Sequence, residues 1–377
     1  MAPNELTALA INRVPFLKPR EKLLLLEVCA TPERLAGLSA SALPAILGRA
    51  VRSNNWDPAA ELRRAEADRK LLTSGAIQCT FIWSPDFPRL LREIYDPPVV
   101  LYYRGSLPTP QEVWVGVVGT RHPTGSGRGA AFALAFELAG LGVGTVSGLA
   151  RGIDAEAHRG SLAEGGRTVG VLGNGIDRVF PSSSAPIGRR ILESGGCILS
   201  EYPPGEPPRP YHFPGRNRII SGLARTVVVV QAPEGSGALI TAEYALEQGR
   251  ELVVHAEGLE GPAGAGTRWL AEQGAESVRG AADILAGWGE NPLLRRENPP
   301  QRRGRQPLIG ANPLQRRGRQ PLIGANPLLR HGRMPVLAAR QAALASGRWS
   351  AAEVLARQME SELAHELAIH NGEVLYG

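Results

Sequence analysis

The fold is decided by one stretch, Val113-Trp-Val-Gly-Val-Val-Gly-Thr-Arg-His-Pro-Thr124, in which a run of β-branched residues ends at a glycine turn. The run has no polar alternation, which predicts a strand buried on both of its faces. A helical stretch follows at 126–141. A buried strand, a glycine turn and a helix, in this order, form the first half of a parallel strand–helix–strand unit.

The same alternation continues toward the C-terminus. It predicts an α/β fold over residues 76–290, with a Rossmann-like, mostly parallel sheet that carries helices on both faces. Ligands of such sheets bind beyond the carboxyl ends of the strands. Further strands are predicted at 144–147, 168–172, 197–200, 226–230 and 252–254, and further helices at 153–164, 187–193, 216–223 and 239–248.

Three other segments flank this region. Residues 1–75 predict a small helical (SAM-like) N-terminal domain, in which Thr31 caps a helix. Residues 291–334 contain a 14-residue tandem repeat rich in Pro, Gly and Arg, which predicts a basic linker without a core of its own. The linker is either a spacer or an auxiliary electrostatic contact. Residues 335–377 predict a small C-terminal domain that resembles a shortened winged helix.

The charge of the chain is concentrated in the linker. The 377 residues carry a formal net charge of +6. Ten arginines and Glu297 give the linker +9, and subtracting nine from six leaves −3 for the rest. Overall basicity is therefore no argument for a DNA-binding surface on the folded part. Three widely spaced cysteines without metal-ligand spacing favour a reducing cytoplasm, and we expect neither a signal peptide nor a membrane segment.

Four glycine-rich turns follow predicted strands, and they begin at Gly119, Gly148, Gly173 and Glu234. Glycine lets backbone amides approach an anion closely, and a helix N-terminus adds unpaired N–H donors. Several such phosphate cradles along one rim suit a polyanion, such as one strand of DNA, better than a single nucleotide. The guanidinium groups of arginines near these turns could donate paired hydrogen bonds to a phosphate. These arginines are Arg121, Arg151, Arg216 and Arg218.

Each feature also has a purely structural interpretation. Tight packing alone explains a glycine-rich turn between a strand and a helix. Asp154 and His158 lie four residues apart on a predicted helix, and we expect a capping carboxylate and a hydrogen-bonded histidine that shape the loop. Arg216 and Arg218 could equally pair with acidic residues of the fold. Tyr211, His212 and Phe213 could stack on bases, although Phe213 fits a core position as well.

Seven segments between residues 86 and 285 carry a resemblance to a known family. In content and order they resemble the DNA-processing protein A family (DprA, also called Smf). Thr120 departs from the usual serine, and the Pro-Gly expected after the strand is missing at 255–257. The segments are the lead-in Asp86-Phe-Pro-Arg-Leu90 to Ser106, Val118-Gly-Thr-Arg121, Ser147-Gly-Leu-Ala-Arg-Gly-Ile-Asp154, Val171-Leu-Gly-Asn-Gly-Ile-Asp177, Ser200-Glu-Tyr-Pro203, Phe213-Pro-Gly-Arg-Asn-Arg-Ile-Ile220 and Ser236-Gly-Ala-Leu-Ile-Thr-Ala242.

The resemblance implies a dimeric, cytoplasmic protein that binds and protects single-stranded DNA. It further implies loading of the recombinase RecA during natural transformation, past single-strand-binding protein. We expect no catalytic activity, cofactor or metal. Arg151 joins the DNA site by its charge and position, and Gly235, Ser236 and Gly237 join it by their glycine turn. Carried onto matching positions, the resemblance adds Gly119, Thr120, Arg121, Ser147, Gly148, Arg216, Asn217 and Arg218.

Two other functions stay open. Glu234-Gly-Ser-Gly237 with Thr241 and Glu243 looks somewhat like the loop of phosphoribohydrolase enzymes that act on nucleoside monophosphates, but the preceding Pro-Gly-Gly is absent. No nucleophile–base pair, HExxH, P-loop lysine or poised carboxylate pair is evident, which disfavours catalysis. Alternatively, the Rossmann-like domain serves only dimerisation, and the basic linker supplies any affinity for DNA.

Overall fold

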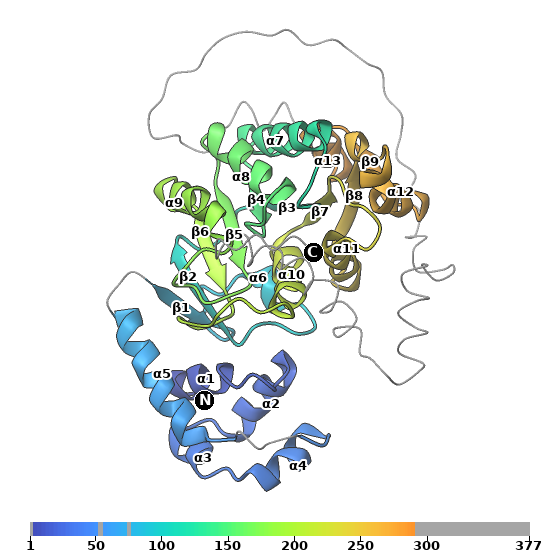
Figure 1. Cartoon of the computed structure of the whole chain (residues 1–377). Coiled ribbons are helices and arrows are strands. Elements are labelled where there is room, and N and C mark those ends of the chain that lie inside the picture. The colour runs from blue at the N-terminus through green and yellow to red at the C-terminus, as the bar shows by residue number, and fades with distance from the viewer. Residues whose placement is uncertain (1–2, 52–55, 74–76, 291–377) are drawn as a thin grey trace, which may run out of the picture.

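The computed structural model describes residues 3–51, 56–73 and 77–290 (Figure 1). The predicted linker (291–334) and C-terminal domain (335–377) lie outside these residues. Within the described ranges nine strands form one sheet, in the order β1-β2-β6-β5-β4-β3-β7-β8-β9. All neighbours from β6 to β9 are parallel, whereas β1 and β2 are antiparallel to their neighbours. The prediction of a Rossmann-like, mostly parallel sheet is confirmed.

The parallel strands match the predicted apolar runs closely. The chain runs from β3 through β4 and β5 to β6 in one direction, then returns to β7 on the other side of β3. This reversal between β3 and β7 is the kind of switch point at which α/β sheets bind ligands. The parallel strands are β3 (Trp114–Val118), β4 (Gly144–Ser147), β5 (Thr168–Leu172), β6 (Cys197–Ser200), β7 (Thr226–Val229), β8 (Glu251–His255) and β9 (Glu276–Val278).

Helices cover both faces of the sheet, as Figure 1 shows. Val115 and Val117 of β3 share one apolar core with α7, α8 and α13. Trp114 and Val118 point to the opposite face and share a second core with α10 and α11. The helices are α6 (Arg89–Arg92), α7 (Gly125–Gly140), α8 (Ile153–Ala163), α9 (Ala185–Glu193), α10 (His212–Leu223), α11 (Gly237–Glu247), α12 (Ala265–Glu272) and α13 (Ala281–Gly287), with 3₁₀ turns at Ala40–Ala42, Ser182–Ser184, Ala256–Gly258 and Pro262–Gly264.

Helix α10 begins four residues earlier than predicted, at His212 rather than Arg216. Pro214 lies in its first turn, where the missing N–H would have no partner within the helix in any case. The prediction that Arg216 and Arg218 stand at a helix N-terminus is therefore wrong. Both arginines lie further inside the helix, and their side chains are buried.

The N-terminal helices pack against the antiparallel end of the sheet, which is formed by β1 (Gln78–Phe81) and β2 (Val100–Gly105). Leu9 and Leu25 belong to the same apolar core as Val100 and Tyr102 of β2. Thr31 caps its helix as predicted, accepting from the Arg34 N–H at 3.4 Å. None of the helices described is both long and apolar enough to cross a membrane. The N-terminal helices are α1 (Glu5–Asn12), α2 (Pro19–Val28), α3 (Pro32–Ala36), α4 (Leu43–Leu47) and α5 (Pro58–Thr73).

Candidate nucleic-acid interface

The loops at the carboxyl ends of β6, β5, β4, β3 and β7 form one edge of the sheet, which we call the rim. The rim comprises residues 201–211, 173–178, 148–152, 119–124 and 231–236, in the order of the strands. Backbone hydrogen bonds join neighbouring loops: the Thr120 N–H donates to the Gln231 carbonyl at 2.7 Å, and the Ile153 N–H donates to the Thr120 carbonyl at 3.2 Å. The structure thus brings together the turns that the sequence singles out.

Close packing between these loops explains two of the glycines. A Cβ at position 119 would lie 2.5 Å from Cγ1 of Ile153 and 2.8 Å from the Gln231 carbonyl oxygen. Gly152 has φ of +76°, and a Cβ there would lie 2.4 Å from the Thr120 carbonyl oxygen. These glycines are required by the approach of one loop to the next. Their presence is therefore not by itself a sign of a phosphate.

The loop after β4 uses its own amides internally. The carboxylate of Asp154, which is 6% exposed, accepts from the Gly148 N–H at 3.0 Å and from the Ala150 N–H at 3.4 Å. Burial raises the pKa of Asp154, and the nearby Arg216 opposes this shift. His158 lies one turn further along α8, and its Nδ1 pairs with the Thr168 hydroxyl at 2.8 Å. The prediction that Asp154 shapes the loop is confirmed, and His158 is hydrogen-bonded as predicted, although to Thr168 of β5 rather than to the loop.

Three of the predicted DNA-binding side chains face the interior. The Ser147 hydroxyl is fully buried and donates to the Val117 carbonyl at 2.7 Å. Arg216 is 5% exposed, and its Nη1 donates to the carbonyls of Gly148 and Val171, at the ends of β4 and β5. Asn217 donates from Nδ2 to the Gly237 carbonyl at 3.2 Å. These side chains fasten the rim to the sheet and to α10.

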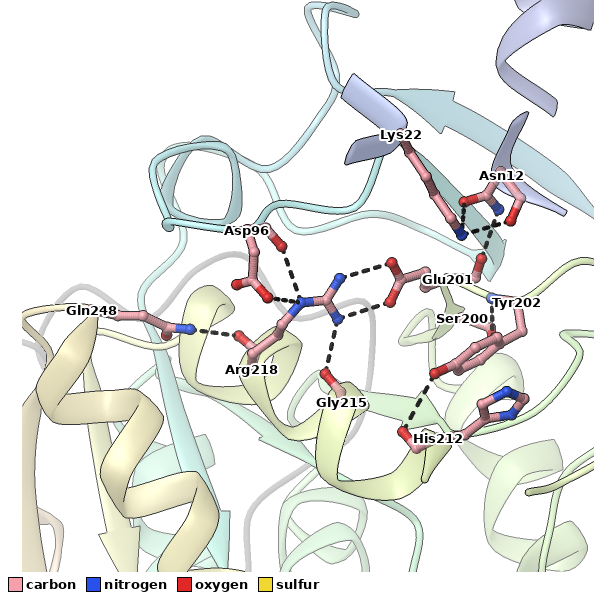
Figure 2. A network of polar contacts seen from close by, with 10 residues as sticks. All are labelled: Asn12, Lys22, Asp96, Ser200, Glu201, Tyr202, His212, Gly215, Arg218 and Gln248. Carbon is pink, nitrogen blue, oxygen red and sulfur yellow. Dashed lines mark hydrogen bonds and ion pairs between the residues drawn. The ribbon is translucent and has the colours of Figure 1, made fainter. Parts of the chain in front are cut away.

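Arg218 is the clearest correction to the sequence-based site. Its side chain is 2% exposed, and all three guanidinium nitrogens have partners. Nη1 and Nη2 donate to the two Glu201 carboxylate oxygens at 2.8 and 2.7 Å, and Nε lies 3.1 Å from an Asp96 carboxylate oxygen (Figure 2). Burial opposes ionisation of Glu201, but Arg218 outweighs it and holds the pKa of Glu201 below its ordinary value. We therefore assign Arg218 a structural role in the fold rather than a role in binding DNA.

The same network reaches the N-terminal helices (Figure 2). The Asn12 side-chain amide donates to the Glu201 carbonyl at 2.9 Å, and Lys22 Nζ donates to the Asn12 carbonyl at 2.7 Å. On the other side of Glu201, the Tyr202 ring stacks on His212 with centroids 3.9 Å apart. Sequence reasoning gave Glu201 no role, although it lies in one of the resembling segments. These contacts fix the loop 201–211, which leads into α10.

Other rim side chains do reach solvent. Arg121 and Arg151 are half-buried, His122 and Arg178 are exposed, and Tyr211 is 49% exposed. We call these five residues the rim surface. Arg121 and His122 follow β3, Arg151 follows β4 and Arg178 follows β5, whereas Tyr211 lies at the end of the loop from β6 to α10. Sequence reasoning missed His122 and Arg178, whose exposure depends on the course of the loops.

The loop before α11 closes the other end of the rim. Gly235, Ser236 and Gly237 are half-buried. Ser236 caps α11 by accepting from the Ala238 N–H at 3.3 Å, and a Cβ at Gly237 would meet nothing within 4 Å. Thr241, which the enzyme alternative requires near this loop, is 1% exposed. Among the described residues no group of three or more His, Cys, Asp and Glu side chains could hold a metal ion.

The comparison with known families identifies the family of this chain. A family model described as DNA recombination-mediator protein A matches residues 78–289, more than half of the chain. The chain belongs to this family. Protein Smf of Synechocystis sp. is 44% identical over 214 residues, covering 56% of this chain and 54% of the relative. The chain thus spans about half the length of that curated relative.

Two solved structures add to this comparison. The X-ray structure of DNA processing protein A from Streptococcus pneumoniae has a TM-score of 0.62 and 32% identity, and covers 76% of this chain and 98% of that one. A structure of DNA processing protein A from Helicobacter pylori, described for its single-stranded DNA binding mode, has a TM-score of 0.49 and 28% identity. It covers 56% of this chain and 95% of that one.

Proposed function

We propose that this protein binds single-stranded DNA along the rim surface, without catalysing a reaction on it. The observation that carries the proposal is the order of the exposed side chains. Tyr211, Arg178, Arg151 and Arg121 follow β6, β5, β4 and β3, which are consecutive in the sheet. A basic track with an aromatic residue on it is typical of binding to single strands, because arginine contacts phosphates and the ring stacks on a base.

The dimensions of the rim fit this proposal. Neighbouring strands lie about 4.8 Å apart, so the five strand ends from β6 to β7 span roughly 20 Å. That length is suited to a short stretch of several nucleotides rather than to one mononucleotide. The network around Arg218 keeps Glu201 and Asp96 paired below the rim surface, so these two carboxylates do not repel an approaching phosphate backbone.

Membership of the recombination-mediator family supports the finer parts of the proposal. We propose that the protein works as a homodimer in the cytoplasm, that it protects incoming single-stranded DNA, and that it loads RecA onto this DNA during natural transformation. Displacement of single-strand-binding protein would precede loading. We also propose the division into a helical N-terminal domain (1–75), a Rossmann-like domain (76–290), a basic linker (291–334) and a winged-helix-like domain (335–377).

The first test is fluorescence anisotropy with labelled oligo-dT over a series of salt concentrations. Arg121→Ala combined with Arg151→Ala should weaken binding, because both side chains are partly exposed at the rim. Each lost phosphate contact flattens the log–log salt dependence by about 0.7, so the double variant should lose about 1.4. Arg64→Ala is the matched control, because Arg64 is exposed on α5 and belongs to none of the loops that form the rim. Deletion of 291–334 measures the contribution of the linker.

The outcomes separate DNA binding at the rim from DNA binding by the linker alone. Loss of affinity in the double variant, with binding kept in the linker deletion, supports the rim. Loss only in the linker deletion refutes it and assigns the affinity to the linker. Tyr211→Ala should weaken binding by roughly tenfold or more without changing the salt dependence, since stacking contributes about 1–3 kcal/mol per base. Tyr95→Ala is the control for this variant, because Tyr95 is 77% exposed and lies shortly after the end of α6.

A further inference from the structure

A pocket of about 420 Å³ opens at the edge of the sheet opposite the rim. Trp114 begins β3, Arg225 directly precedes β7 and Arg250 directly precedes β8, and all three line the pocket. Because β3, β7 and β8 are parallel, the full length of these strands separates the pocket from the rim. Its volume lies within the range of about 300–1,000 Å³ that is usual for small-molecule sites. We call it the amino-end pocket.

Trp114 supplies an unusual donor to this pocket. Its side chain is 4% exposed, and its indole N–H has no hydrogen-bond partner among the described residues. The Cε3–Cζ3 edge of the ring covers Gly144 of β4, where an added Cβ would lie 2.3 Å from Cε3. The opposite edge, which carries Nε1, therefore faces away from β4. A buried donor without an acceptor is rare in proteins, and a bound ligand is one of its explanations.

Arg250 supplies a second donor of the same kind. Its Nη2 donates to the Leu90 carbonyl at 2.7 Å and to the Gly222 carbonyl at 3.3 Å, so the guanidinium group is held in place. Its Nε is buried and has no partner within the described part of the chain. A fixed cation with an unused N–H is suited to an acceptor that carries negative charge.

Arg225 adds a third basic group on the solvent side. Its guanidinium carbon lies 4.4 Å from the ring centroid of Trp288, and Nη1 donates to Glu290 at 3.1 Å. The two acidic lining residues are already paired. Glu93 accepts from Arg89 at 3.0 Å, and Glu112 accepts from Arg167 and from the Thr109 N–H. The lining carries three arginines (Arg89, Arg225 and Arg250) against these two carboxylates, so its formal charge is +1.

The remaining wall is apolar and stiff, because Pro88, Pro108 and Pro110 line it together with Leu90, Val113 and Leu223. We infer that the amino-end pocket binds a small organic anion whose carboxylate or phosphate lies against Arg225 and Arg250, beside the Trp114 ring. The apolar body of the ligand packs on the prolines and leucines. The size of the site suits a small molecule, which distinguishes this ligand from the DNA strand proposed for the rim.

The test follows the indole N–H signal of Trp114 by two-dimensional ¹⁵N–¹H NMR of the full chain. The six tryptophans give six indole signals, and the one missing in Trp114→Phe belongs to Trp114. The probes are benzoate, thymidine 5′-monophosphate and inorganic phosphate. We expect the Trp114 signal to move on titration with benzoate or with the nucleotide, which tells a carboxylate ligand from a phosphate ester. Inorganic phosphate, which has no apolar body, should bind more weakly.

Two variants and one competitor decide the outcome. Arg225→Gln should weaken binding about tenfold, since hydrogen bonds to charged groups are worth roughly this factor. Arg225 is half-exposed, so its replacement leaves the core intact. Arg69→Gln, on α5, should change nothing. The inference is overturned if no probe moves the Trp114 signal at concentrations near 1 mM, if Arg225→Gln binds like the wild type, or if oligo-dT displaces the probe, because the probe would then occupy the rim.

Discussion

Replacement of Glu201 by glutamine should destabilise the fold strongly. Glutamine keeps the shape but removes the charge that faces Arg218, so a guanidinium group only 2% exposed loses its bidentate partner. Breaking a buried pair in this way costs about 3–5 kcal/mol. The Asp96 carboxylate remains 3.1 Å from Arg218 Nε, which places the loss at the lower end. A loss of about 3 kcal/mol corresponds to a fall in melting temperature of roughly 6–12 °C for a domain of this size.

Thermal unfolding followed by near-UV circular dichroism measures this loss at neutral pH. Glu206→Gln is the matched control, because Glu206 pairs with Arg209 on the surface of the same loop and should contribute at most about 0.5 kcal/mol. The double variant Glu201→Met with Arg218→Met should be more stable than Glu201→Gln, since no buried guanidinium group is left without its bidentate partner. Equal melting temperatures for Glu201→Gln and Glu206→Gln would refute the reasoning.

The difference in stability between the wild type and Glu201→Gln should depend on pH in a predictable direction. The pKa of Glu201 in the folded protein lies below its ordinary value of 4.5. The stability contributed by this carboxylate is therefore complete above the ordinary pKa, and is lost as the pH falls through the folded-state pKa. The difference between the wild type and Glu201→Gln should accordingly be constant near neutrality and shrink in acid below about pH 4.5.

Two further predictions follow from residues under the rim. Gly148→Ala would place a Cβ 2.2 Å from Arg216 Nη1 and should cost about 1–3 kcal/mol in urea unfolding, whereas Gly237→Ala, in open space, should unfold like the wild type. Burial lowers the pKa of His158 to about 3, so between the ordinary value of 6.5 and about 3 the unfolded chain binds a proton that the folded protein does not. Stability should fall by roughly 1 kcal/mol for each pH unit of acidification in this window, and His158→Gln should flatten the measured slope.

Most of the parallel sheet could be predicted because strands such as β3 and β5 are unbroken apolar runs followed by a glycine turn. The strands predicted at 144–147, 168–172 and 197–200 have these bounds in the structure. Strands β1, β2 and β9 and helices α12 and α13 were not predicted. The place of the two antiparallel strands at the sheet edge depends on the pairing of β2 with β6, which follows much later in the chain.

The sequence predicted which edge of the sheet carries the candidate site, but only some of the side chains that face solvent there. A glycine turn after a buried strand places a residue at the carboxyl edge, which is why Arg121 and Arg151 were located correctly. Whether an arginine points outward depends on partners that are distant in sequence. Arg218 meets Glu201 across 17 positions and Asp96 across 122, and no local pattern encodes these encounters. The signal for the start of α10 was misread for a local reason, because Pro214 is tolerated within a first helical turn.

Backbone N–H groups of the rim donate hydrogen bonds within the protein, and this affects the affinity of the rim for DNA. Asp154 closes the loop after β4, and Gln231 and Thr120 join this loop to its neighbours, so the edge acquires its shape when the sheet folds. A strand of DNA that docks there meets a preorganised surface and does not have to order these loops on arrival, which removes an entropic penalty from association. Binding strength should then follow ionic strength closely, while the backbone of the edge stays the same in the free and bound states.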